Sequence, residues 1–369
     1  MIIPFQPEHL EGFIELNRLC GFPERSAAGW HWVFFENPDQ DDEPPGYVFF
    51  RKGEMAGVVG THRRIYRRRD EMMTMASGHT LISDLKVPGT GFRLARHVVG
   101  ANGCDAINTM NNNALSAPIY PRIGMMPWRG ERGREYLEYP VDWPRLLASN
   151  GLNRLTGLGL RLPSFGRERL SSRLRSFEGI YHAGGLDRID PFDPMSAMQL
   201  DDFNTGLQSG DTYFMNRGAD VWRYRLSDPD YDACSGLFAF KSAGRIKGLL
   251  AVSLSKEAPF STGTLEIEDI AILPGEERVR EACLLAVAEI AEACHVARAR
   301  WRVLPDDLDV SQLKGWVLRQ REYDTCHAKA PTNLLSNLHI SPADGDFFFA
   351  LRRPDKFRSV SQTAATSAA

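Results

Sequence analysis

Apolar residues along the chain follow two kinds of pattern. Short runs rich in Val, Ile and Phe occur in pairs, residues 47–50 with 55–60 and residues 237–240 with 246–251, and a short turn that contains glycine separates the members of each pair. Such pairs predict β-hairpins. Over residues 279–297 the apolar positions instead follow helical spacing, with three glutamates near the first turn. This second pattern predicts a helix that lies on a sheet.

Each predicted helix is followed by another apolar run. Residues 299–304 form this run in the second half of the chain, and residues 106–110 form the corresponding run in the first half. Residues 113–125 are then expected to form a short helix that leads into a glycine turn. We therefore predict that each half is built as strands, helix, strand and helix.

The two halves resemble one another in sequence. Three pairs of residues are each separated by 191 positions, namely Pro38 and Pro229, Gly53 and Gly244, and Gly57 and Gly248. The match resumes between residues 85–89 and residues 271–275. Trp30, Trp32 and Trp222 precede the repeated motif, and we expect them in the core or at an interface between domains. The repeat predicts a duplicated α/β unit.

Composition divides the chain into four parts. We expect one domain at residues 1–140, a second domain at residues 201–356, and a disordered tail rich in Ser, Thr and Ala at residues 357–369. Residues 141–200 carry many Pro, Gly and Arg residues and are predicted to be a connector with one or two short helices.

Two basic clusters occur along the chain. Residues 154–175 hold six arginines and one acidic residue; this segment could make a weak contact with an anionic membrane face or polymer, and the alternative is a solvated linker helix across the two domains. The second cluster, at residues 62–69, is expected to be a strand end and turn, with anion binding as its alternative.

Composition and charge narrow the class of protein. Of the 369 residues, 43% are hydrophobic and 25% are charged, as in soluble globular proteins with room for two domains. The formal net charge is −3, so no overall basic field attracts nucleic acid. No apolar run approaches the roughly 20 residues that span a bilayer, and the N-terminus lacks the pattern of a signal peptide. We expect a cytoplasmic protein.

The sequence lacks the motifs of several common classes of enzyme. The six cysteines show no C-x-x-C pair, and the nine histidines show no zinc-binding spacing such as H-E-x-x-H. The chain also lacks a G-x-x-x-x-G-K-[ST] phosphate loop and a G-x-S-x-G nucleophile motif. Metal hydrolases, nucleoside triphosphatases and serine hydrolases are therefore disfavoured, and no metal is expected.

One segment resembles a known family. Asn113, Tyr120, Gly124 and Met125 have the spacing of a late motif of the GCN5-related N-acetyltransferase (GNAT) superfamily. The repeated tryptophan motif and the Gly-Asp pair near residue 345 also look like tandem GNAT-like proteins associated with bacterial envelope polysaccharide synthesis. The resemblance implies a mixed α/β fold, with mainly antiparallel central sheets flanked by helices, in two tandem GNAT-like acyl-CoA N-acyltransferase domains.

The resemblance also implies a site for acetyl-CoA or another acyl-CoA. The pyrophosphate would bind backbone N–H groups at the start of a helix, and the thioester would lie along a strand that contains Leu85 and Val87. The residues implied for acyl-CoA are Leu85, Val87, Gly89, Thr90, Gly91, Phe92, Arg93 and Asn113. The turn departs from the family pattern, because Phe92 or Arg93 stands where that pattern has a small residue.

The same resemblance implies roles in catalysis. By motif position Tyr120 would protonate the leaving thiolate, and the alternative for this residue is a buried core tyrosine. Asp84, His79 and Glu36 are candidates for the general base because they lie near the predicted site. In the second copy Leu318 occupies the position of Tyr120 if Glu322 and Tyr323 are aligned with Gly124 and Met125, and the turn at residues 273–278 contains two acids where the diphosphate would dock. We expect the second copy to be inactive.

Two functions are favoured. The first is an acyl-CoA-dependent N-acyltransferase, expected to be an acetyltransferase, that acts on a primary amine such as an amino sugar or another envelope precursor by direct attack of the amine on the thioester. The second is a degenerate tandem fold without catalysis that binds a ligand or a partner enzyme as a regulator or scaffold. Spacing alone fixes neither the acceptor nor the oligomeric state.

Overall fold

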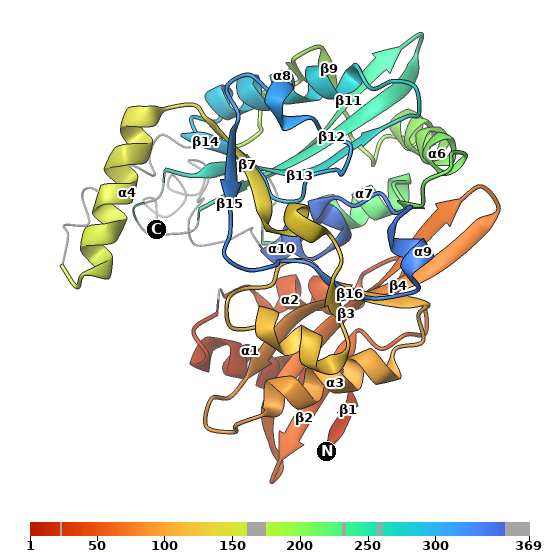
Figure 1. The fold of residues 1–369 in the computed structure, drawn as a ribbon. Coiled ribbons are helices and arrows are strands. Elements are labelled where there is room, and N and C mark those ends of the chain that lie inside the picture. The colour runs from red at the N-terminus through yellow and green to blue at the C-terminus, as the bar shows by residue number, and fades with distance from the viewer. Residues whose placement is uncertain (23, 161–174, 231–233, 257–259, 261, 351–369) are drawn as a thin grey trace, which may run out of the picture.

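The computed structural model describes the chain except residues 23, 161–174, 231–233, 257–259, 261 and 351–369. The described residues form two mixed sheets, which lie one above the other in Figure 1. The first sheet has the order β1-β2-β3-β4-β5-β16-β6, with β10 paired to β3. Its strands are β1 (Ile2–Pro4), β2 (Gly46–Arg51), β3 (Glu54–Arg68), β4 (Glu71–Ser83), β5 (Ala106–Thr109), β6 (Met126–Pro127), β10 (Phe214–Met215) and β16 (His327–Lys329).

The second sheet has the order β15-β7-β14-β13-β12-β11-β9-β8. Its strands are β7 (Glu135–Pro140), β8 (His182–Ala183), β9 (Leu186–Arg188), β11 (Ser235–Ser242), β12 (Arg245–Ser255), β13 (Thr264–Ile272), β14 (Arg298–Trp301) and β15 (Val317–Gln320). In both sheets the described strand pairs are antiparallel, apart from β4 with β5 and β13 with β14. The predicted fold class, a mixed α/β protein with mainly antiparallel sheets, is confirmed.

Both predicted hairpins form, and their turns have the same backbone conformation. Lys52 and Gly53 connect β2 to β3 with φ values of 52° and 84°, and Ala243 and Gly244 connect β11 to β12 with φ values of 49° and 74°. Two successive residues with positive φ match the right-handed twist of paired strands, and glycine takes the second place because it has no Cβ to clash.

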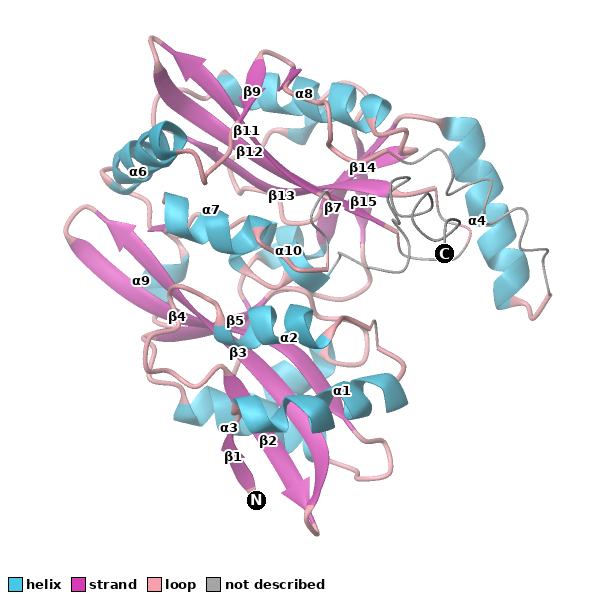
Figure 2. Ribbon diagram, turned by 180° about the vertical axis from the view of Figure 1, so that it is seen from behind, coloured by secondary structure: helices cyan, strands magenta, loops and turns pink. Residues whose placement is uncertain are grey.

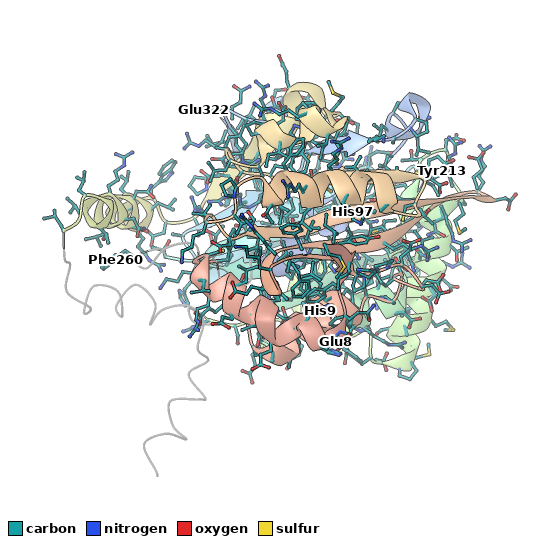
Figure 3. The ribbon with its side chains drawn as sticks, turned by 90° about the horizontal axis from the view of Figure 1, so that it is seen from below. Glu8, His9, His97, Tyr213, Phe260 and Glu322 are labelled. Carbon is teal, nitrogen blue, oxygen red and sulfur yellow. The ribbon has the colours of Figure 1, made fainter. Side chains whose placement is uncertain are left out.

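Helices cover both faces of the first sheet. The pleat points alternate side chains to opposite faces, so Val48 and Val58 pack with α1 (Leu10–Leu19) and α2 (Ala27–Phe35). Tyr47 and Val59 pack on the other side with α3 (Thr90–Ala101). Figure 3 shows α3, marked by His97, and α1 on opposite sides of these strands.

The second sheet has the same layered arrangement. Leu250 and Val252 of β12 pack against α8 (Val279–Ala293), the helix predicted after Pro274. Leu249 and Ala251 pack on the opposite face with residues of α6 (Pro194–Gln208) and α7 (Ala219–Leu226). Each half therefore has its own two-faced hydrophobic core.

The repeated tryptophan motif lies where the two halves meet. The Trp32 indole nitrogen donates to the Tyr224 carbonyl oxygen at 2.8 Å, and the two rings lie 5.0 Å apart. Figure 2 shows α2, α7 and α10 (Phe347–Ala350) between the sheets. Trp30, Trp32 and Trp222 are all buried, so the expectation of core or interface tryptophans is confirmed.

The two sheets exchange strands between the halves of the sequence. β7 comes before the connector but pairs with β14 and β15 of the second sheet. β16 comes near the C-terminus but lies between β5 and β6 of the first sheet. The domain boundaries at residues 140, 200 and 356 stay a prediction, and a cut at residue 140 would separate strands that pair.

One predicted strand is wrong. Leu85 and Val87 lie in a turn instead of a strand, because β4 ends at Ser83 and the Asp84 carboxylate accepts the Lys86 N–H at 2.8 Å, which closes a local turn. The basic cluster at residues 62–69 is the last part of β3, which ends at Arg68, and the turn that begins at Arg69, where φ is 53°; the expected strand end and turn is therefore confirmed, and this part of the strand buries His62 and Arg64.

The connector contains the described helix α4 (Trp143–Gly157) and the start of α6, and it also supplies β8 and β9 at one end of the second sheet. In Figures 1 and 2 α4 projects to one side of the sheets. Residues 161–174 of the arginine cluster and the whole tail at residues 357–369 lie outside the described residues. None of the described helices is long and apolar enough to span a membrane.

Candidate active site

A cavity opens where the parallel strands β4 and β5 diverge. The two strands pair only from Met75 to Ser77, after which β4 continues to Ser83 paired with β3 alone. Thr80 in this continuation has a φ of 48°, a left-handed conformation that is uncommon for a residue with a side chain. The cavity has a volume of about 350 Å³. Its described walls are Asn17, Phe22, Arg25, Trp30, Val59, Gly78, His79, Thr80, Leu81, Ile82, Ala95, Val98, Val99, Ile107, Thr109, Asn111, Asn112, Asn113, Ser116, Tyr120, Met125, Asp346, Phe349 and Ala350.

The cavity lies further upstream along β4 than the sequence predicts. It borders residues 78–82, whereas the expected position was beside Leu85 and Val87. Leu85 is 91% exposed and, like Val87, is not on the described walls. The shift follows from the turn at Asp84, which ends the strand before these two residues.

Tyr120 stands on a short helix that faces the cavity. This helix, η2 (Ala117–Ile123), is a 3-10 helix with Pro118 in its first turn, where a proline costs no hydrogen bond. It ends at Gly124, which has a φ of 84°, and the chain turns back so that the Met125 N–H donates to the Tyr120 carbonyl oxygen at 3.0 Å. The Asn-x₆-Tyr-x₃-Gly-Met spacing therefore places Asn113, Tyr120 and Met125 on one cavity wall.

The Tyr120 hydroxyl is held in its protonated form. Burial, together with the negative charge of Asp346, raises the pKa of Tyr120 to about 12, although a hydrogen bond with Thr109 acts in the opposite direction. Only 7% of the Tyr120 surface is exposed. At neutral pH this residue can donate a proton.

The second half of the chain contributes to the same wall. The Asn112 side-chain nitrogen lies 2.8 Å from Thr109 Oγ1 and 2.9 Å from His327 Nδ1. The His327 ring lies 5.3 Å from the Tyr120 ring. Because His327 is on β16, the exchanged strand connects the surroundings of Tyr120 to the other half of the protein.

Asp346 is a further residue from the second half that lines the cavity. It follows η5 (Pro342–Asp344) and precedes α10. Burial raises the pKa of Asp346 to about 7, although a hydrogen bond from Asn111 acts to lower it. Its Oδ1 atom is buried without a hydrogen-bond partner. Sequence reasoning did not assign this residue; the only signal was the resemblance of the Gly-Asp pair to the ending of tandem GNAT-like proteins.

The three predicted candidates for the general base lie in different places. His79 is on the cavity wall, with its Nδ1 atom 2.9 Å from Thr80 Oγ1, but burial lowers the pKa of His79 to about 3, which makes it a weak base. Asp84 caps the turn after β4. Glu36 ends α2 and lies 3.1 Å from His31. Neither of these two carboxylates is on the described walls.

The turn predicted for acyl-CoA does begin a helix. Gly89 is the N-cap of α3, has a φ of 80°, and provides no side chain to cap the first-turn N–H groups. Thr90 is buried and its hydroxyl donates to the Val87 carbonyl oxygen at 2.9 Å. A Cβ atom added to Gly91 would meet only Ser83 Oγ, at 3.5 Å. This helix start therefore has room and backbone donors for an anion.

The remaining residues predicted for acyl-CoA have distinct surroundings. Phe92 is partly buried, and Arg93 is exposed, with its guanidinium 6.0 Å from the centre of the Phe49 ring. The Asn113 side-chain oxygen accepts the N–H groups of Leu115 and Ser116, each at 2.9 Å. Asn113 thus shapes the turn before η2 as well as lining the cavity.

The second half contains buried ion pairs beside β13. Asp269 on β13 accepts from Arg217 Nε at 2.9 Å, and Asp344 lies 2.8 Å from the same guanidinium, with all three side chains fully buried. The alignment of Leu318 with Tyr120 is wrong, because Leu318 lies in β15. Gly315, 191 residues after Gly124, has the matching left-handed φ of 82°.

The described residues offer no candidate metal site, since no three His, Cys, Asp or Glu side chains in that part of the chain are grouped to hold an ion.

No family model and no curated protein matches this sequence. Solved structures do match. A GCN5-related N-acetyltransferase from Anabaena variabilis shares 11% identity over 89% of this chain and 72% of its own, with a TM-score of 0.51. An Enterococcus faecalis protein described as a "Probable N-Acyltransferase" shares 12% identity over 90% of this chain and 73% of its own, with a TM-score of 0.54. At such identities the likeness concerns the fold alone, and the fold is one that this chain shares with a GCN5-related N-acetyltransferase structure.

Proposed function

We propose that this protein is an acyl-CoA-dependent N-acyltransferase whose reaction takes place in the first half, with an acetyl group as the simplest acyl group and a primary amine as acceptor. The observation that carries the proposal is the cavity between the diverging strands β4 and β5, with a protonated Tyr120 on its wall. The fold shared with a GCN5-related N-acetyltransferase structure supports the assignment. The link to envelope polysaccharide synthesis and a cytoplasmic location stay predictions from the sequence.

The start of α3 is the part of the chain that fits the diphosphate of acyl-CoA. Its first-turn N–H groups have no side-chain cap, and the helix dipole favours an anion there. Ser83, next to Gly91, follows directly after the cavity residue Ile82. A cofactor held at α3 would therefore reach the gap between β4 and β5 with its thioester arm.

The chemistry needs few groups from the protein. The amine nitrogen attacks the thioester carbonyl carbon, the C–N bond forms, and the C–S bond breaks. After Ser77, the side of β4 that faces β5 is not paired with another strand. Backbone N–H groups on this unpaired side can stabilise an oxyanion. Tyr120 donates its proton to the departing thiolate.

Calorimetric titration of acetyl-CoA and a longer acyl-CoA tests the cofactor site. Gly91→Glu places a negative charge at the proposed diphosphate site, and we expect at least a tenfold loss of affinity, whereas Gly91→Ala should retain affinity because Gly91 has room for a Cβ atom. The helix dipole stabilises an acidic side chain in the first turn, so Gly91→Glu should lose affinity for acyl-CoA without losing stability. If the wild-type protein binds neither thioester, the non-catalytic scaffold becomes the better description.

Turnover of Tyr120→Phe tests the role of the hydroxyl. Loss of a general acid typically lowers the rate about 100-fold or more, while acyl-CoA affinity should stay nearly unchanged because the ring remains. The thiol released from acetyl-CoA in the presence of an amine measures this directly. Equal turnover of the variant and the wild type would remove Tyr120 from the mechanism.

A further inference from the structure

The charges on the cavity wall limit which amines can react. We propose that the acceptor is a primary amine that carries no anionic group, and that Asp346 binds it as an ammonium ion and then takes its proton. This inference rests on the proposed function and adds the chemical class of the acceptor to it.

Asp346 supplies the negative charge for this selection. It lines the same cavity as Tyr120, and its charge is close enough to affect the Tyr120 hydroxyl. Its Oδ1 atom has no hydrogen-bond partner in the described structure, whereas Asn111 donates to the carboxylate. A buried carboxylate with an unused acceptor atom is stabilised by a cationic donor and destabilised by a second anion.

Besides Asp346, the described walls carry one side chain with a permanent charge, Arg25. Its positive charge is already balanced by carboxylates outside the cavity walls. Its guanidinium forms ion pairs with Asp228 and, at 3.4 Å, with Asp230. It also donates to the Phe349 carbonyl oxygen at 3.2 Å. A carboxylate or phosphate on the acceptor would have to compete with two carboxylates for this arginine, and it would be repelled by Asp346.

The other side chains that this inference uses on the cavity walls are neutral. Phe22, Trp30 and Phe349 contribute aromatic surface, and Asn17 and Asn111 contribute amides. Aromatic faces bind an ammonium ion favourably, and amides can bond to hydroxyl groups without adding charge. An amine with an apolar or hydroxylated body fits these walls, whereas an amino acid or a sugar phosphate brings an unmatched negative charge.

The proton balance of the step is complete with these residues. The ammonium ion gives one proton to the Asp346 carboxylate, and the neutral amine attacks the thioester carbon. Tyr120 gives its proton to the thiolate as the C–S bond breaks, and the resulting tyrosinate takes the second proton from the nitrogen. The products are the amide and the free thiol, and Asp346 returns its proton to solvent.

Two matched pairs of acceptors test the proposal. The pairs are glucosamine with glucosamine 6-phosphate, and 2-phenylethylamine with phenylalanine, because each pair differs by one anionic group. With acetyl-CoA held constant, kcat/KM should be at least about tenfold higher for the non-anionic member of a pair. Equal or better acylation of the anionic members would overturn the proposal.

Substitution of the carboxylate tests the assigned residue. Asp346→Asn keeps the size of the side chain, and it should lower kcat/KM for the non-anionic amines at least tenfold while removing most of the preference within each pair. Asp202→Asn, an exposed substitution on α6, should change neither. A preference within the pairs that persists in Asp346→Asn would overturn the role of Asp346.

The failure of this inference is distinct from the failure of the proposed function. If acetyl-CoA binds but no member of either pair is acylated, the acceptor class is wrong and the cofactor site stands. If acetyl-CoA does not bind, the acyltransferase function falls. The acceptor role falls with it, and calorimetric titration of the amines alone then decides only whether Asp346 selects non-anionic amines, which is supported if binding prefers the non-anionic members and is lost in Asp346→Asn.

Discussion

At the scale of single residues, the histidine on the described cavity walls, His79, has a strongly altered ionisation. Its ring lies 4.2 Å from the His62 ring and 5.2 Å from the Phe349 ring. Burial, followed by the charge of Arg64, lowers the pKa of His79 from 6.5 to about 3. Below pH 6.5 the unfolded chain therefore binds a proton that the folded protein does not, and stability falls with pH until about pH 3.

The change His79→Gln removes this titration. Between about pH 6 and pH 4 the free energy of unfolding should fall less steeply in the variant than in the wild type, by about 1.4 kcal/mol per pH unit. Asp346, whose raised pKa acts in the opposite direction, is present in both proteins, so its effect cancels. Urea denaturation at several pH values measures the slopes, and exposed His182→Gln is the control. Parallel slopes would contradict the burial argument.

The sequence predicts part of the site and misses the rest for a physical reason. Tyr120 is predicted from motif spacing and His79 from its nearness in sequence, and both line the cavity; the predicted turn at Gly89 begins α3. Asp84 and Glu36 are near in sequence, but local turns direct them elsewhere. Asp346 and His327 reach the cavity only through contacts between the two halves, and such contacts leave no periodic signal in a single sequence.

At the scale of elements, β16 is the strand that completes the first sheet. Ala328 is paired with Asn108 on one side and with Met126 on the other. Ala328→Pro removes a backbone N–H in the interior of the sheet, and we expect a loss of roughly 3 kcal/mol or more in the free energy of unfolding. Turnover should fall as well, because the neighbouring His327 contacts Asn112.

Leu318→Pro is the matched control, because β15 is an edge strand with a single partner and edge positions tolerate proline better. Chemical denaturation and acyl-CoA turnover of the two variants make the comparison. An equal loss in both would mean that the interior position of β16 is not what matters.

The elements themselves are predicted better than their arrangement. Hairpins and long helices have strong periodic patterns, and the hairpins at residues 52–53 and 243–244 and the helix α8 all form as expected. The strand expected at Leu85 fails because a single side chain, Asp84, closes a turn. The exchange of β7 and β16 could not be predicted, because a short strand of three to six residues carries no information about which sheet accepts it.

At the scale of the whole molecule, the exchanged strands predict that the two halves unfold together. Arg217 reinforces this coupling: it follows β10, which pairs with β3 of the first sheet, and it binds Asp269 of the second sheet and Asp344 of the C-terminal segment. Arg217→Met leaves these two buried carboxylates without their cation, which typically costs about 3–5 kcal/mol. Because Arg217 connects a strand of the first sheet to a strand of the second, hydrogen exchange should quicken in both sheets alike, and denaturation should keep one transition. Two separate transitions, or faster exchange in the second sheet alone, would show instead that the duplicated units fold independently despite the strands they share.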